Sequence, residues 1–192
     1  MSLAVPYLAL RECDWLVDTC TWLNLAAAPR LALAVMRGCG PRLRIPHMVV
    51  EELGERANGL LSPLRTATQV DMTVPEMRDW YELITAHWDR EAARNRGEAA
   101  CIAIATSRRW SLLMDDGVAV RVSVDRGLPV MRTANLLVSG AAAEWWTPLE
   151  AWEGFQQMVS ARRNRLGPEL WDWTSLDDFL RVCAAETARL RR

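Results

Sequence analysis

The stretch that decides the fold lies near the N-terminus and has the sequence Asp14-Trp15-Leu16-Val17-Asp18-Thr19-Cys20-Thr21-Trp22. Its apolar centre, Trp15 to Val17, predicts a short buried strand, and a helix-compatible segment follows from Thr19. Asp18 therefore stands at the end of a core strand, where a carboxylate needs a partner, a helix cap or a metal ion. Taken alone, Asp18 is best explained as the N-cap of the following helix.

Composition limits the class of protein. A chain of 192 residues with 51% hydrophobic and 24% charged residues is long enough for one domain with a full core. The net charge of -1 gives no global positive field, so any binding of nucleic acid has to come from local patches. Five dispersed cysteines without a Cys-x-x-Cys spacing predict reduced thiols in a cytoplasmic protein. The chain shows no leader peptide and no apolar run of membrane-spanning length, so we expect neither export nor membrane insertion.

Strand and helix patterns alternate along the chain, which favours a parallel α/β sheet. We expect strands at 15–17, 43–46, 110–114 and 128–131. We expect helices at 22–36 with a break at Pro29, at 47–53, from 73 to about 88, and at 98–105, 118–124, 134–143, 148–159 and 176–190. In the helix from 73, an apolar stripe at helical spacing predicts core positions at Met77, Trp80, Tyr81, Ile84 and Trp88.

Acidic residues follow these strands or begin the helices at four places: Asp18, the pair Glu51 and Glu52, Glu98, and the pair Asp115 and Asp116. The carboxyl ends of parallel strands share one edge, so we expect the acids to converge there. Converging carboxylates repel one another and need bound cations or shared protons. Oxygen ligands favour hard ions, Mg²⁺ or Mn²⁺, and such ions suit phosphoryl chemistry.

These segments resemble the four acidic motifs of PIN domains. The matching segments, in order, are Val17-Asp18-Thr19, Ile45-Pro46-His47-Met48-Val49-Val50-Glu51-Glu52-Leu53, Gly97-Glu98-Ala99-Ala100-Cys101-Ile102-Ala103 and Leu112-Leu113-Met114-Asp115-Asp116. The resemblance continues through 127–133 and 136–137, and it is close to the subgroup of VapC-type toxins. It implies a PIN-like α/β/α sandwich with a central, mostly parallel sheet and additional C-terminal helices. We assign residues 1–160 to the PIN domain and 161–192 to a C-terminal helical extension packed on or near it, within one structural domain.

The resemblance also implies an activity: a Mg²⁺- or Mn²⁺-dependent endoribonuclease, often a dimer and often the toxin of a toxin–antitoxin pair. Its partners would be an RNA substrate, an antitoxin protein and a second copy of the chain. Carried over, the metal ligands would be Asp18, Glu52, Glu98 and Asp116, with Asp115 as the alternate at the last position and Thr19 as a hydroxyl neighbour. Two departures concern the surrounding hydrogen bonds: Cys20 stands where many members have Asn, and Met114 where they have a small hydroxyl residue.

Other interpretations remain open. A PIN-like module that binds RNA or protein without catalysis would keep the fold, and Cys20 and Met114 favour it. A phosphatase of the haloacid dehalogenase type also begins with a strand-end Asp, but such enzymes carry a second Asp where this chain has Cys20. Among the ten tryptophans, four are expected to bury a dimer or partner interface, or else to stack on bases: Trp145, Trp146, Trp171 and Trp173.

Overall fold

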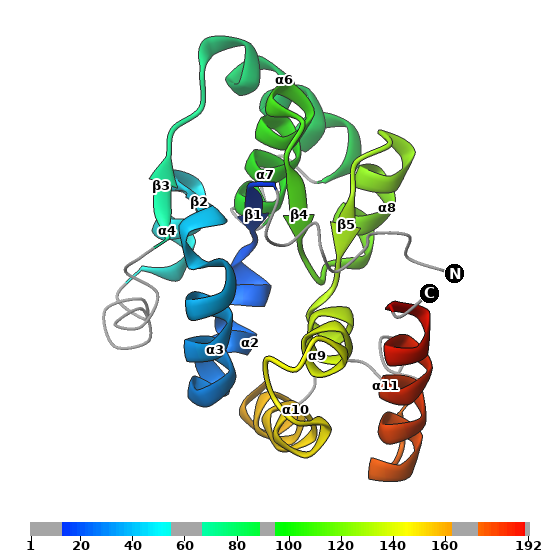
Figure 1. Ribbon diagram of the computed structural model, residues 1–192. Coiled ribbons are helices and arrows are strands. Elements are labelled where there is room, and N and C mark those ends of the chain that lie inside the picture. The colour runs from blue at the N-terminus through cyan, green and yellow to red at the C-terminus, as the bar shows by residue number, and fades with distance from the viewer. Residues whose placement is uncertain (1–12, 55–66, 89–94, 163–172, 191–192) are drawn as a thin grey trace.

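A computed structural model describes residues 13–54, 67–88, 95–162 and 173–190. Five parallel strands form one sheet in the order β3-β2-β1-β4-β5, which confirms the α/β prediction (Figure 1). The strands are β1 (Trp15–Val17), β2 (Leu43–Pro46), β3 (Thr68–Val70), β4 (Ser111–Leu113) and β5 (Val130–Met131). β3 falls in a segment whose sequence gave a weak pattern, because two of its three residues are exposed and it lacks the apolar signature of the other strands.

The helices occupy most of the remaining described chain. They are α2 (Thr19–Ala27), α3 (Pro29–Cys39), α4 (His47–Leu53), α6 (Val74–His87), α7 (Arg96–Arg108), α8 (Gly117–Asp125), α9 (Thr133–Ala142), α10 (Pro148–Arg162) and α11 (Leu176–Leu190). A short 3-10 turn, η1 (Gly40–Arg42), leads into β2. The predicted break at Pro29 is confirmed, since Pro29 begins α3 and has no backbone N–H to continue α2.

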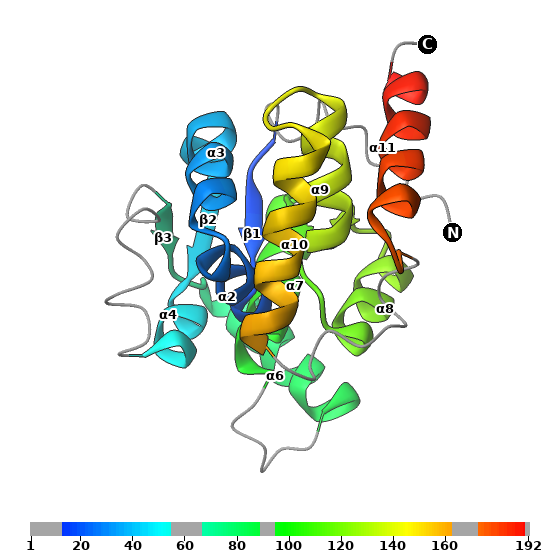
Figure 2. The same ribbon diagram turned by 90° about the horizontal axis from the view of Figure 1, so that it is seen from below.

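Helix α7 lies at the centre of the molecule and packs on β1, β2 and β4. It is buried from Gly97 to Ala105, as expected for a helix that is apolar on every side. Helices α6, α4 and α8 contact it, whereas α10 joins α2, α3 and α9 into a second group of helices (Figure 2). None of the described helices is long and apolar enough to cross a membrane.

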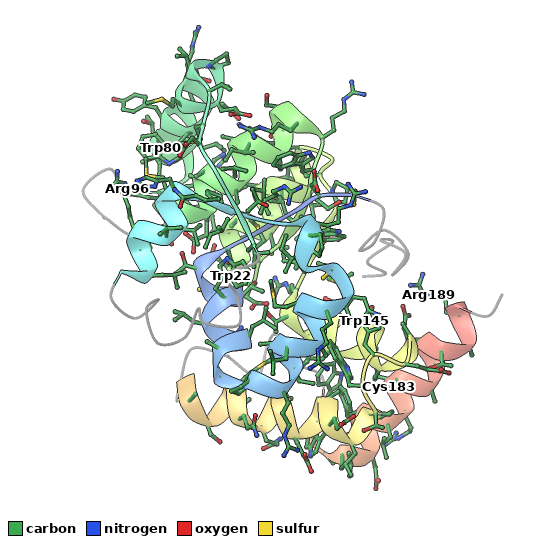
Figure 3. The ribbon with its side chains drawn as sticks, turned by 60° about the vertical axis from the view of Figure 1, so that its left-hand side comes forward. Trp22, Trp80, Arg96, Trp145, Cys183 and Arg189 are labelled. Atoms are coloured by element: carbon green, nitrogen blue, oxygen red, sulfur yellow. The ribbon has the colours of Figure 1, made fainter. Side chains whose placement is uncertain are left out.

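The C-terminal helix α11 packs against α9 and α10. Its contact is aromatic: the Trp173 ring lies 4.6 Å from that of Phe179 and 5.4 Å from that of Phe155, between ring centroids. Figure 3 shows Cys183 and Arg189 further along the same helix. The helix thus adds Phe179 and Cys183 to the same hydrophobic core as the other described helices.

The structure corrects two predictions about apolar residues. Of the predicted stripe on α6, Ile84 is buried and Trp80 and Trp88 pack against the core, as expected. Met77 and Tyr81 are instead 50% and 57% exposed, because the face of α6 that meets α7 is centred on Leu83 and Ile84. Trp146 is 6% exposed and donates its indole N–H to the Leu137 carbonyl at 2.9 Å, so it is buried within its own chain rather than at a partner interface. Trp145 and Trp173 also pack against this internal core, and Trp171 lies outside the described residues.

Candidate metal centre

The candidate site lies where the chain changes direction across the sheet. From β1 the chain moves outward through β2 to β3, and then returns to place β4 on the other side of β1. In open parallel sheets, ligands bind at such a switch point, beside the carboxyl ends of the strands. Here two hydrogen bonds join those ends: the Asp18 N–H donates to the Leu113 carbonyl at 3.0 Å, and the Asp115 N–H donates to the side-chain Oδ2 of Asp18 at 3.3 Å.

Asp18 is fully buried at this point. Its Oδ1 accepts the N–H of Thr21 at 2.6 Å, which confirms that it is the N-cap of α2. Burial, followed by the charges of Asp115 and Glu98, raises the pKa of Asp18 well above its ordinary value. The hydrogen bonds from Thr21 act in the other direction. Asp18 is therefore a cap that also stands among other acids, a combination that a capping role alone does not require.

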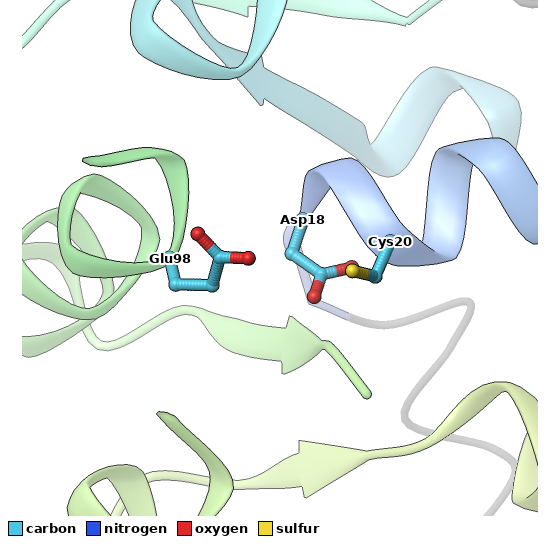
Figure 4. Close-up of side chains that lie close together, drawn as sticks. All are labelled: Asp18, Cys20 and Glu98. Carbon is cyan, nitrogen blue, oxygen red and sulfur yellow. The ribbon is translucent and has the colours of Figure 1, made fainter. Parts of the chain in front are cut away.

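Glu98 is the third residue of α7, and its side chain points toward Asp18 (Figure 4). It is 5% exposed, and its Oε2 is buried without a hydrogen-bond partner in the described structure. Burial, then the charges of Glu52 and Asp116, raise the pKa of Glu98 to about 7. A buried carboxylate oxygen without a partner costs free energy, so it is a natural ligand for a cation.

Glu52 is held in place by two donors. Its Oε2 accepts the hydroxyl of Thr19 at 2.5 Å, and its Oε1 accepts the N–H of Gly97 at 2.8 Å. Thr19, predicted as a hydroxyl neighbour, thus positions this carboxylate. Its neighbour Glu51 points away: its side chain is 51% exposed and meets His47 Nε2 at 3.3 Å. The geometry separates the two glutamates that the sequence left side by side.

Gly97 permits this close approach of α7 to α4. A Cβ atom at this position would lie 2.7 Å from Glu52 Oε2, 2.9 Å from Val49 Cγ2 and 3.1 Å from Thr19 Oγ1. Any side chain here would push the carboxylate of Glu52 out of its place. The Gly97-Glu98 pair at the start of α7 therefore contributes to the site in two ways. The Gly97 N–H positions the carboxylate of Glu52, and Glu98 adds its own carboxylate.

Asp115 and Asp116 have different surroundings. Asp115 is 6% exposed and already accepts three hydrogen bonds, from Asn24 Nδ2 at 2.7 Å and from Thr133 N and Oγ1 at 2.9 and 2.5 Å. Asp116 caps α8 through one oxygen, Oδ1, which accepts the N–H groups of Val118 and Ala119. Because the second oxygen of Asp116 takes no part in the cap, Asp116 suits a ligand better, and Asp115 suits a positioning role.

Cys20 was noted in the sequence only as a departure from the family pattern. In the structure it lies close to two of the acids. Its Sγ and one carboxylate oxygen each of Asp18 and Glu98 all lie within 4.8 Å of one another (Figure 4). Met114, the second departure, is fully buried in the core and its sulfur accepts the Ser123 hydroxyl at 3.6 Å. Met114 is thus a packing residue, whereas Cys20 belongs to the site.

A surface pocket of about 160 Å³ opens beside the buried acids and is lined by Met48, Glu51, Glu52 and Arg96. The Arg96 guanidinium lies 5.7 Å from the ring centroid of Trp80, and Figure 3 shows the two side chains together. Glu52 lines this pocket and also influences Glu98, so it links the surface to the buried cluster. A charged ligand in the pocket would meet one cation and two carboxylates.

The sequence analysis did not assign a site role to two polar residues, Asn24 and Thr133, because no charge or motif distinguishes them from other polar residues. A weak signal was present: Asn24 follows Asp18 by six residues and is buried in α2, and Thr133 follows the last strand. In the described residues, none of the ion pairs involves the four predicted ligands Asp18, Glu52, Glu98 and Asp116. The acids thus face one another without Arg, which fits a donor set for a divalent cation.

Comparison of the sequence with models of known protein families gives a match to one family. The profile of DUF3368, described as a PIN domain, matches residues 14–172, which span every acid of the site. No curated protein and no solved structure matches the chain. The match covers far more than half of the sequence and includes β1, α4, α7 and β4, which carry the acids. The chain therefore belongs to the PIN-domain family.

Proposed function

We propose that this chain is a metal-dependent endoribonuclease that holds Mg²⁺ or Mn²⁺ between Asp18, Glu52, Glu98 and Asp116. The observation that carries the proposal is the buried Oε2 of Glu98, which has no hydrogen-bond partner and belongs to a side chain that points toward Asp18 (Figure 4). In the described part of the chain, neither carboxylate forms an ion pair with an Arg. A bound cation would relieve the repulsion between the two carboxylates. Family membership supports the nuclease class, since PIN domains are typically nucleases that bind metal.

Each part of the site has a role in this proposal. A bound Mg²⁺ or Mn²⁺ would supply positive charge to the scissile phosphate and lower the pKa of an attacking water. Thr19 and Gly97 orient the carboxylate of Glu52, while Asn24 and Thr133 fix Asp115 behind Asp18. Single-stranded or looped RNA is the proposed substrate, because an unstacked backbone can reach a recessed acidic site.

Within the family we propose the subgroup of VapC-type toxins, on the order and spacing of the four acidic motifs. An antitoxin protein and a homodimer are the partners that this assignment predicts. The competing candidate is a PIN-like module that binds RNA or protein without cutting, and Cys20 at the site is the observation that favours it. Co-purification with an antitoxin would support the subgroup without deciding between the two activities.

The test is cleavage of a labelled single-stranded RNA with Mn²⁺ or Mg²⁺, with and without a chelator. Asp18→Asn should lower the rate by on the order of 10³-fold, because a metal ion contributes several kcal/mol to the transition state. Glu52→Gln should also be strongly impaired. Glu51→Gln, which changes the exposed neighbouring carboxylate of the pocket, should lower the rate far less than Glu52→Gln. The control outside the site is Glu82→Gln, an exposed carboxylate on α6 that should keep wild-type activity. RNA binding without any cleavage by the wild type would favour the non-catalytic module, and cleavage that resists the chelator would overturn the metal mechanism.

A further inference from the structure

We propose that Cys20 is a third ligand beside Asp18 and Glu98, so that the site binds a thiophilic divalent ion of the Zn²⁺ class as well as Mg²⁺ or Mn²⁺. The inference rests on the proposed metal site and adds a choice of metal to it. It concerns the position at which this chain departs from the usual pattern, Asn in many relatives and Cys here.

The first support is the position of the donor atoms. Cys20 Sγ, one oxygen of Asp18 and one oxygen of Glu98 all lie within 4.8 Å of one another. Tetrahedral zinc with Zn–S and Zn–O bonds of about 2.3 and 2.0–2.2 Å holds its donor atoms roughly 3.3–3.6 Å apart. Side-chain rotations that bring the three donors about 1 Å closer together would therefore let them bind one ion.

The second support is independent of the thiol. Glu98 Oε2 is buried and unpartnered, in a side chain that is only 5% exposed and aimed at Asp18 (Figure 4). A cluster of acids beside a cysteine could otherwise be incidental. The unsatisfied oxygen shows that this cluster lacks a cationic partner among the described residues of the chain.

The donor chemistry selects the class of metal. A thiolate is a soft ligand that Mg²⁺ does not favour, whereas Zn²⁺ accepts sulfur and carboxylate oxygen together. Three protein ligands also leave a fourth position open, as in catalytic rather than structural zinc sites. Binding breaks the S–H bond of Cys20 and forms a metal–sulfur bond, and the proton passes to solvent.

Cys101 is a second cysteine near these acids, and it differs from Cys20 in its surroundings. It is fully buried, and burial, followed by the charges of Asp18, Glu98 and Glu52, raises the pKa of its thiol well above the ordinary value. Cys20 is partly exposed at the second position of α2, where an ion and the released proton can exchange with solvent. The two thiols can be distinguished by substitution.

The experiment uses Co²⁺ as a spectroscopic probe for Zn²⁺, added to the full chain with a reductant present. We expect a sulfur-to-cobalt charge-transfer band in the near ultraviolet that saturates at one Co²⁺ per chain. Cys20→Ser and Cys20→Asn should lose the band, and their affinity for Zn²⁺ should fall at least roughly tenfold. Zn²⁺ should displace the band from the wild type, and an excess of Mg²⁺ should not.

Two cysteine variants serve as controls. Cys13→Ser changes a partly exposed thiol beside Ser111 and should keep the band. Both residues lie at the N-terminal ends of β1 and β4, whereas the acids follow the carboxyl ends. Cys101→Ala should keep the band too, which would assign the sulfur ligand to Cys20.

Calorimetry of Co²⁺ and Mn²⁺ binding distinguishes the proposal for Cys20 from the proposal for the metal site itself. Co²⁺ binding without the band, or a band that survives in Cys20→Ser, would overturn the role of Cys20 and leave the metal site intact. No binding of either ion would overturn both.

Discussion

Two buried glutamates at the start of neighbouring helices have opposite surroundings. Glu76 is the third residue of α6 and is 2% exposed; Glu98 is the third residue of α7 and is 5% exposed. Hydrogen bonds from Arg108, assisted by the Thr73 N–H, lower the pKa of Glu76 to about 2. Burial and neighbouring acids raise that of Glu98 to about 7. Two glutamates with similarly low solvent exposure at equivalent helix positions thus have opposite pKa shifts. Hydrogen bonds from Arg108 are the main cause for Glu76, whereas burial deep among acids is the main cause for Glu98.

The difference distinguishes the two ends of α7. Glu76 and Arg108 satisfy each other through two contacts, at 2.7 and 2.8 Å, and tie α6 to the C-terminal end of α7. At the other end of α7, the charges that act on Glu98 are those of Glu52 and Asp116, and Asp18 and Cys20 lie close to its carboxylate. The first arrangement satisfies its own charge, whereas the second would be completed by the proposed cation.

The largest expected effect comes from removing the Arg at the satisfied end. Arg108→Met leaves Glu76 buried and unpaired and should lower the free energy of unfolding by about 3 kcal/mol. Glu98→Gln should do the opposite in the metal-free protein, because it removes a buried charge that has no partner. Urea unfolding with a chelator measures both. If both variants changed the free energy of unfolding in the same direction, the proposed difference between Glu76 and Glu98 would be wrong.

A somewhat smaller effect is expected from pH. Because the folded-state pKa of Glu98 lies above its ordinary value of 4.5, the folded chain binds more protons than the unfolded chain between about pH 4.5 and 7. The metal-free protein should therefore lose on the order of 2 kcal/mol of stability as pH rises through this window. The stabilisation from Glu76 behaves in the opposite way, since it is fully present above 4.5 and is lost as pH falls toward 2.

Unfolding measured at a series of pH values checks this prediction. Glu98→Gln should make the profile less steep on the neutral side, where Asp18 also contributes, and leave the acid limb in place, whereas Glu76→Gln should weaken the acid limb alone. Added Mn²⁺ should restore stability mainly at the upper end, where Glu98 is ionised. A neutral limb that is equally steep in Glu98→Gln would contradict the assignment.

The smallest expected effect on stability comes from Gly97→Ala. The added methyl group meets Glu52, Val49 and Thr19 and should cost about 1–2 kcal/mol of unfolding free energy. Its effect on the site should be more specific, because Glu52 loses its position. Calorimetry should show weaker Mn²⁺ binding, and Gly154→Ala offers a control that also crowds a helix contact, against Leu31, on the far group of helices. Equal loss of Mn²⁺ affinity in both variants would show that the effect is global.

Much of this organisation follows from the sequence. The apolar runs at Trp15 and Leu112 predict the strands β1 and β4, and Pro29 predicts the start of α3. These predictions succeed because they depend on neighbouring residues in the sequence and not on distant contacts. The convergence of the acids follows from the parallel sheet, whose carboxyl ends share one edge. These local and topological rules also placed Asp18 correctly as a helix cap.

The remaining features depend on contacts between distant segments. The family pattern favours Glu52 over Glu51, but helical spacing alone does not separate them. The packing of α4 on α7 turns Glu52 toward Gly97 and Glu51 toward solvent. The exposure of Tyr81 likewise depends on which face of α6 meets α7. Cys20 was seen in the sequence only as a missing Asn, because the distance from its sulfur to Glu98 depends on the tertiary fold.

The most direct test of the central claim is the binding of Mn²⁺ followed by electron paramagnetic resonance, in which free Mn²⁺ gives the signal and bound Mn²⁺ loses it. We predict that the wild-type chain removes at least one equivalent of Mn²⁺ from the signal. Asp18→Asn and Glu98→Gln should not remove it, while a folded Glu76→Gln protein should still do so. An undiminished signal with the wild type, or equal binding by Glu98→Gln, would contradict a metal site at the carboxyl edge of the sheet.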